Sequence, residues 1–179
     1  VLECVRDGAA VTCFSGDKLV GGPQCGILVG DAARIRRIRA HPLYRAFRCD
    51  KLTLAALEAT LRVYRDGAPT EQIPVLRALA KAPATLRREA ERLAAAIGEP
   101  AHVVSSESYA GSGANPARPL PSHAVALPGG KALADALRVP DQHGPGIFAR
   151  IVEDSVWFDV RALAEADFEP LAVRVRARS

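Results

Sequence analysis

Lys18 lies in a segment whose residue types suit covalent and anion chemistry. Ser15 and Asp17 precede it, and Gly21 and Gly22 follow it. A lysine amine can form a Schiff base with an aldehyde when a neighbouring group takes its proton. Glycines permit positive φ angles and let backbone N–H groups approach an anion, and a serine hydroxyl adds a donor. The segment therefore suits a phosphorylated aldehyde cofactor.

The same residues also suit plainer roles. They would fit a simple phosphate site, although the P-loop pattern Gly-x-x-x-x-Gly-Lys-[Ser/Thr] is absent. Spacing alone favours an exposed lysine in a surface turn over a catalytic one. Asp17 is either a turn-capping residue or an acid that holds Lys18 and assists proton transfer. The glycines either shape the loop or help to hold an anion.

Two predicted strands flank this loop, at 10–14 and 25–29. A helix is predicted over 31–40, with Asp31 as its N-cap, and a His-Pro pair ends it. A longer helix is predicted over 50–64. Its apolar residues recur on one face, which we expect to be buried: Leu54, Leu57, Leu61 and Tyr64.

The second part of the chain changes from helices to short strands. Gly98 is expected to end a helix predicted over 83–97. The predicted elements are helices over 70–81, 83–97 and 131–137, strands at 103–104 and 124–127, a turn-rich loop at 111–116, a hairpin that pairs 147–152 with 156–160, and one or two terminal helices. This alternation indicates a small α+β domain beside an α/β piece.

Composition places the chain among ordinary proteins, with 49% hydrophobic and 25% charged residues. No apolar run approaches the roughly 20 residues of a bilayer span, so a cytoplasmic location is the default expectation. The net charge of +4 is compatible with an RNA partner, although a GC-rich genome explains the arginines and alanines more simply. The chain starts with Val1 and contains no Met, so we expect the C-terminal part of a longer protein.

The four cysteines lack the spacing of a zinc site. Cys13 and Cys25 lie in apolar runs and are expected to be buried thiols. Trp157 and Phe158 lie in a predicted strand and are expected in the core. The last arginines are expected to form a solvated basic tail, with contact to an RNA backbone as the alternative: Arg174, Arg176 and Arg178.

Two blocks of sequence closely resemble bacterial selenocysteine synthases, the L-seryl-tRNA(Sec) selenium transferases. The first, residues 11–30, reads VTCFSGDKLVGGPQCGILVG, and the second, residues 41–61, reads HPLYRAFRCDKLTLAALEATL. Shorter similarities follow in the same order at 111–113, 120–122, 146–151 and 157–161. Together they cover nearly the whole chain.

The resemblance implies a fold-type I enzyme that depends on pyridoxal 5′-phosphate (PLP). Residues 1–66 would be the C-terminal remnant of its PLP-binding large domain, and residues 67–179 a small α+β domain. Lys18 would form the internal aldimine. Asp17 would support Lys18 in catalysis, while two further residues of the loop would help to bind the cofactor: Ser15 and Gln24.

The resemblance also implies the reaction and its partners. Seryl-tRNA(Sec) would become selenocysteinyl-tRNA(Sec) through an aminoacrylyl intermediate, with selenophosphate as the donor. Arg45 and Arg48 would hold the donor's phosphate-like group, since they share a face if the segment is helical; a solvated basic face is the alternative. The family suggests a homo-oligomer built from dimers, up to a decamer, and no membrane partner.

Two other functions stay open at this stage. One is a related PLP-dependent lyase or transferase that acts on an amino acid or a sugar acid without tRNA. The other is a non-catalytic fragment that only assembles with a longer copy. We also expect the chain alone to be inactive, because it carries Lys18 without most of a cofactor pocket.

Overall fold

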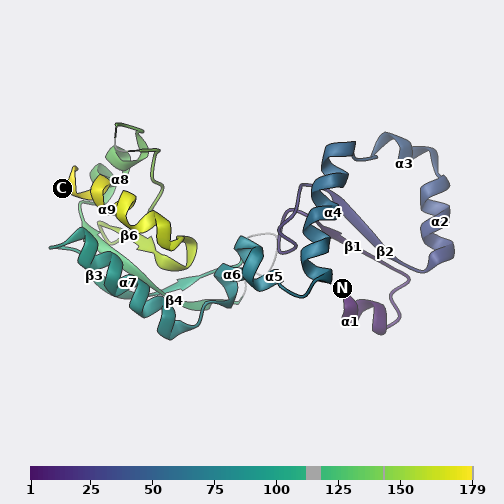
Figure 1. The fold of residues 1–179 in the computed structure, drawn as a ribbon, viewed down its shortest axis with the longest axis horizontal. Helices are drawn as coiled ribbons and strands as arrows, with labels where there is room; N and C mark the ends of the chain where they lie inside the picture. Colours follow the sequence, from purple (N-terminus) through teal and green to yellow (C-terminus); the bar gives the residue numbers. More distant parts are fainter. Residues whose placement is uncertain (112–117, 143, 179) are drawn as a thin grey trace. The chain divides into compact units, whose positions relative to one another are not determined.

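The computed structural model describes residues 1–111, 118–142 and 144–178. The chain forms two compact units, Val1–Arg77 and Ala78–Ser179 (Figure 1). A functional division at 66/67 stays a prediction. Most of the expected loop at 111–116 lies outside the described residues. No helix in the described ranges is long and apolar enough to cross a bilayer.

An antiparallel hairpin organises the first unit. Strands β1 (Val11–Ser15) and β2 (Gly26–Gly30) pair from Val11 opposite Gly30 to Ser15 opposite Gly26. A short helix, α1 (Leu2–Arg6), precedes them. The pairing of the two strands confirms the predicted strands to within a residue and makes residues 16–25 the loop that joins them.

Local capping sets the helices that follow the hairpin (Figure 1). In α2 (Ala32–Ala40), the N-cap Asp31 carboxylate accepts the Arg34 N–H at 2.9 Å, as predicted. Helix α3 (Pro42–Ala46) follows directly. In α4 (Lys51–Arg65), the N-cap Asp50 carboxylate accepts two backbone N–H groups and a threonine hydroxyl.

The helix predicted over 70–81 is divided in two. Helix α5 (Pro69–Gln72) ends before Ile73, which is extended, and α6 (Pro74–Ala80) starts at the next residue. A proline disfavours the helical conformation in the residue before it. The single-helix prediction was therefore wrong at Pro74.

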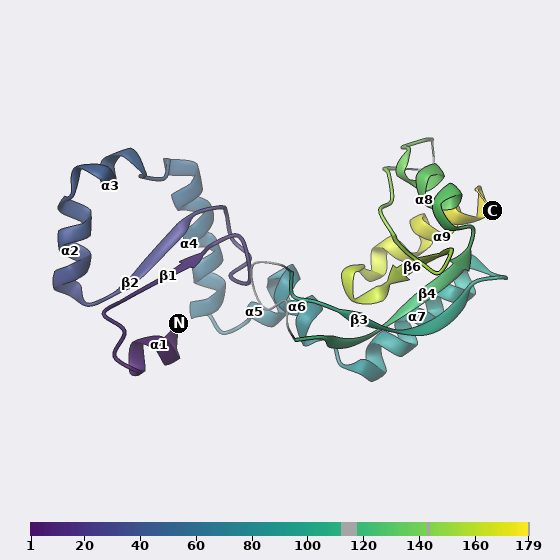
Figure 2. The same cartoon turned by 180° about the vertical axis from the view of Figure 1, so that it is seen from behind.

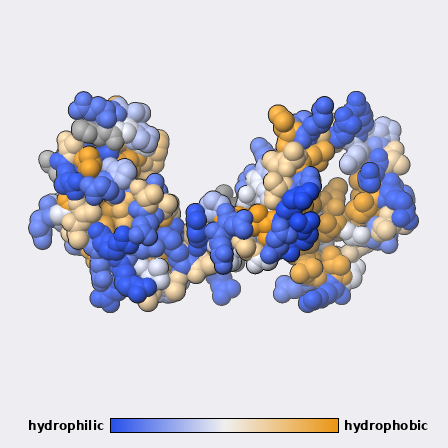
Figure 3. Space-filling view, viewed as in Figure 1, coloured by the Kyte–Doolittle hydropathy of each residue, from blue (hydrophilic) through white to orange (hydrophobic). Residues whose placement is uncertain are grey.

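The first unit has almost no core. Among residues 1–77, all of which are described, only Gly16 and Ile73 are buried. The predicted buried face of α4 is open, with Leu54 53% and Leu61 46% exposed. Cys13 is exposed and Cys25 is only partly buried, against the prediction. Figure 3 shows apolar side chains reaching the surface over this unit. The periodicity of α4 thus marks a face that this chain does not cover.

The second unit is an antiparallel sheet with helices on one face (Figure 2). Its strand order is β3-β4-β6-β5. The strands are β3 (His102–Ser108), β4 (Leu120–Pro128), β5 (Arg150–Val152) and β6 (Ser155–Asp159). The helices are α7 (Pro83–Ile97), α8 (Gly130–Arg138) and α9 (Phe168–Arg176), with short 3-10 turns at Val160–Ala162 and Glu165–Asp167.

This unit encloses a continuous apolar core. Leu93 of α7, Val125 of β4, Leu137 of α8 and Val175 of α9 are each 0% exposed and belong to one cluster. Phe158 joins the cluster, as predicted. The neighbouring Trp157 points to the other face and is only partly buried, because successive residues of a strand alternate between faces.

Two buried arginines hold backbone segments in place. Arg174, 1% exposed, donates to four carbonyls in and after α8 and pairs with Asp141. It is a core residue, so the predicted solvated tail was wrong at this position. Arg161 donates to carbonyls at the end of α6 and to Pro121 O at 2.6 Å. Both arginines satisfy backbone acceptors that would otherwise be buried and unpaired.

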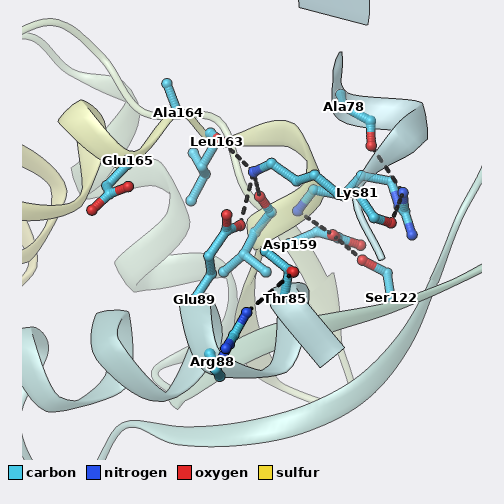
Figure 4. Close-up of polar contacts among 12 residues, drawn as sticks. Ala78, Lys81, Thr85, Arg88, Glu89, Ser122, Asp159, Leu163, Ala164 and Glu165 are labelled. Carbon is cyan, nitrogen blue, oxygen red and sulfur yellow. Dashed lines mark hydrogen bonds and ion pairs between the residues drawn. The ribbon is translucent and has the colours of Figure 1, made fainter. Parts of the chain in front are cut away.

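A polar cluster lies where α7 meets the end of β6 (Figure 4). Lys81 Nζ donates to Glu89 Oε2 at 2.8 Å and to the carbonyls of Val160 and Leu163. Nearby, the Asp159 carboxylate accepts three serine hydroxyls and the Arg161 N–H. Burial tends to raise the pKa of Asp159, yet these hydrogen bonds outweigh it and hold that pKa below its ordinary value.

Candidate active site at the lysine loop

Backbone hydrogen bonds close the loop that carries Lys18. Gly16 N donates to Cys25 O at 2.9 Å and so extends the hairpin by one pair. Gly22 N donates back to Gly16 O at 2.8 Å, and Gly21 N donates to Lys18 O at 3.0 Å. All three glycine amides are therefore used within the loop. The prediction that they could approach an anion does not fit this geometry.

Gly21 is required by its conformation and by its neighbour. Its φ of +73° lies in the region that favours glycine. A Cβ atom there would clash with Ile73 Cγ2. Ile73 is the one buried large side chain of the first unit, so the loop packs on it. Gly21 thus serves loop geometry, one of the two roles considered from the sequence.

Tyr64 fixes the loop from α4. Its hydroxyl lies 3.0 Å from Val20 O and 3.2 Å from Leu19 O and donates to them. Partial burial raises the pKa of the Tyr64 phenol. The helical periodicity places this side chain on an apolar face and gives no sign of the contact, because nothing local links residues that lie so far apart in the chain.

Lys18 and Asp17 form an ion pair within the loop. Lys18 Nζ lies 2.7 Å from Asp17 Oδ2, and the two side chains are 51% and 26% exposed. The hydrogen bond from Lys18 lowers the pKa of Asp17. The structure thus presents an accessible primary amine with a carboxylate in position to hold it.

The other predicted residues of the loop lie at its two ends. Ser15 is the last residue of β1, opposite Gly26, and Gln24 lies near the start of β2. Both are exposed. Neither side chain makes a hydrogen bond with another described residue, so the geometry gives them no structural task within the loop.

Arg45 and Arg48 do not share a helix. Helix α3 ends at Ala46, and Phe47 is its C-cap, so Arg48 lies beyond the helix. The condition under which the two arginines would share a helical face is therefore not met. Both arginines are exposed, and neither guanidinium forms an ion pair or a hydrogen bond with any residue that the structure describes. Two free cations so close in the chain still suit an anion.

These features define a class: a mixed α/β protein with an accessible lysine–carboxylate pair on a hairpin loop and unpaired arginines in the same unit. The family model described as SelA, L-seryl-tRNA selenium transferase, matches residues 1–164. The chain belongs to this family.

Named relatives agree with the family match. An L-seryl-tRNA(Sec) selenium transferase of Solidesulfovibrio magneticus is 40% identical over 96% of the chain. One of Moorella thermoacetica is 43% identical over 94%, and one of Klebsiella pneumoniae strain 342 is 42% identical over 91%. The matches cover only 39%, 37% and 37% of those relatives, so the chain spans less than two fifths of their length.

Proposed function

We propose that this chain carries the cofactor-binding lysine of a selenium transferase that converts seryl-tRNA(Sec) to selenocysteinyl-tRNA(Sec). The observation that carries the proposal is the accessible Lys18 amine, 2.7 Å from Asp17, in a chain about 40% identical to proteins of that name. The seryl-tRNA(Sec) substrate is taken from the names of the relatives.

The residues of the loop suit the aldehyde group of PLP better than its phosphate group. A Schiff base with the aldehyde needs an accessible primary amine, which Lys18 provides, and Asp17 holds that amine in position. The phosphate group needs donors, and the three glycine amides of the loop are already used. Ser15 and Gln24, exposed at the ends of the loop, are the side chains there that remain able to donate. We place most of the phosphate site outside the loop.

Each residue then has a distinct task. Bound PLP supplies an electron sink for loss of the α-proton and the hydroxyl of the esterified serine. Lys18 holds the cofactor and moves a proton at Nζ, and Asp17 orients Nζ. Tyr64 keeps the loop in place by its bonds to the two residues after Lys18. Arg45 and Arg48 would bind the oxyanion of selenophosphate.

The remaining expectations belong to the same proposal. The first unit would be part of a fold-type I large domain, divided from a small domain at 66/67, and the active protein would be a cytoplasmic homo-oligomer built from dimers. A cofactor site on an accessible loop needs further walls that exclude water. The sparse core of the first unit supports this view, since its apolar face is open to such a contact.

Reductive trapping tests the central assignment. The chain is incubated with PLP, reduced with borohydride and digested, and mass spectrometry quantifies the pyridoxyl group on each of its four lysines. We expect preferential labelling of Lys18 and loss of that label in Lys18→Ala. Lys51→Ala is the matched control, because Lys51 is exposed in the same unit. Labelling that follows exposure alone, with Lys51 equal to Lys18, would refute the assignment.

A further inference from the structure

Residues 32–49 form the most strongly charged surface of the chain. They include six arginines and no acidic residue: Arg34, Arg36, Arg37, Arg39, Arg45 and Arg48. The segment has a formal charge of +6 and the whole chain +4, so the other residues sum to −2. The acids on either side, Asp31 and Asp50, are occupied as N-caps. The basic character of the protein is therefore concentrated in this one segment.

The arginines of α2 are free to bind a partner. All four are exposed, and none of their guanidinium groups makes an ion pair or a hydrogen bond within the described chain. Arginines elsewhere do pair: Arg62 with Glu58 at 2.6 Å, and Arg87 with Glu91 at 3.1 Å. Four unpaired like charges on nine residues repel one another, and a polyanion would relieve that repulsion.

A groove with aromatic walls adjoins the same helix. Its volume is about 640 Å³, and Arg34, Arg37 and His41 line it together with Tyr44 and Phe47. Four aliphatic side chains complete the lining: Val11, Leu28, Ile38 and Leu43. Phe47 is 80% exposed, and no acidic side chain lines the groove. Exposed aromatic rings beside arginines suit unpaired nucleotides, whose bases stack while their phosphates pair with the cations.

We propose that α2 and the adjoining groove form an RNA-contact surface, on which the α2 arginines bind phosphates and the two aromatic rings stack on unpaired bases. Arg34 and Arg37 lie along the groove, while Arg36 and Arg39 are not among its lining residues. Charges on more than one side of a short helix suit a flexible phosphate chain better than one face of an acidic protein. The choice of RNA rests on the proposed function.

Salt-dependent binding tests this surface on the whole 179-residue chain. A transcript of selenocysteine tRNA is titrated against the parent and against the variant R34Q/R36Q/R37Q/R39Q at several salt concentrations. Each lost phosphate contact lowers the log–log salt slope by about 1, so we expect a fall of about 3 to 4. We also expect at least a tenfold weaker Kd at moderate salt.

A matched variant controls for total charge. R62Q/R65Q/R87Q/R88Q removes the same charge from exposed positions of α4 and α7, and its slope should fall by less than about 1. Equal losses in the two variants would overturn the proposal. Glutamine is a good helix former, and circular dichroism checks each fold. If the quadruple α2 variant fails to fold, R36Q/R39Q should still lower the slope by about 2.

Two further arms separate the alternatives. Y44A/F47A should weaken RNA binding about tenfold with an unchanged salt slope, because stacking releases no counterions. Polyglutamate serves as an acidic protein probe: if the α2 substitutions abolish its binding and spare that of the tRNA, the partner is a protein and the RNA surface is refuted. Lys18→Ala should bind RNA normally, so failure of the proposed cofactor site would leave this result standing.

Discussion

Replacing Arg174 tests whether one buried side chain holds the second unit together. Its guanidinium donates to Gly144 O at 2.6 Å, Pro145 O at 3.0 Å, Leu137 O at 3.0 Å and Val139 O at 2.9 Å. Arg174→Met keeps much of the apolar volume and removes every donor. The acceptors stay behind with no replacement partner, which makes the change costly.

The magnitude follows from the burial of this side chain. Breaking a buried charged network by removing one partner costs about 3–5 kcal/mol. For a unit of about a hundred residues, each kcal/mol lowers Tm by roughly 4–8 °C, so we expect a fall of at least about 12 °C. The second unit, residues 78–179, has its own core, so its unfolding can be followed in urea by circular dichroism.

Arg87→Met is the matched control for this prediction. Arg87 is 67% exposed on α7, and its only recorded partner among the described residues is Glu91 in the next turn. Exposed pairs of this kind contribute about 0.3–0.5 kcal/mol. If Arg174→Met and Arg87→Met differ by less than about 1 kcal/mol, the four carbonyls find other partners at little cost, and the reasoning is refuted.

Three more predictions concern the lysine loop and the polar cluster. Tyr64→Phe removes a hydrogen-bonding contribution of about 1 kcal/mol and should speed amide hydrogen exchange in the lysine loop several-fold, as measured by mass spectrometry. Unchanged exchange would show that the Tyr64 hydroxyl does not hold the loop. Gly21→Ala should destabilise the first unit more than Gly67→Ala. Both glycines have positive φ, but only at Gly21 would the new Cβ atom clash with a neighbouring side chain, that of Ile73. Folding lowers the pKa of Asp159, so the ionised carboxylate stabilises the folded state fully above about pH 4, and this contribution disappears as the pH falls through the folded-state pKa. Asp159→Asn should flatten that part of the pH–stability curve. An unchanged curve would contradict the role given to Asp159.

Local signals in the sequence predicted the helix ends well. Asp31 caps α2 as expected, and Gly98, with φ +87°, follows the end of α7. The hairpin of β5 and β6 also formed, with its turn at Glu153 and Asp154, both at positive φ. These features depend on residues a few positions apart, so a single sequence contains the information that they need.

Long-range contacts could not be predicted in the same way. The bonds from Tyr64 to the lysine loop and from Arg174 to the carbonyls after α8 join residues 29 to 45 positions apart. An arginine in an apolar helix pattern looks like a surface residue until the fold surrounds it with carbonyls. The prediction that the apolar face of α4 is buried failed for another reason: periodicity shows that a helix face is apolar and does not show what covers it.

The two units differ in what positions their functional groups. In the second unit a closed core fixes the strands, so its buried arginines and Asp159 are held by packing. In the first unit, hydrogen bonds from Gly16, Gly22 and Tyr64 fix the loop, while Lys18 stays half exposed. Hydrogen bonds can set the position of Nζ, but they cannot exclude water from it. A closed site would therefore require further contacts on the open apolar face, and trapping at Lys18 should become more selective when that face is covered.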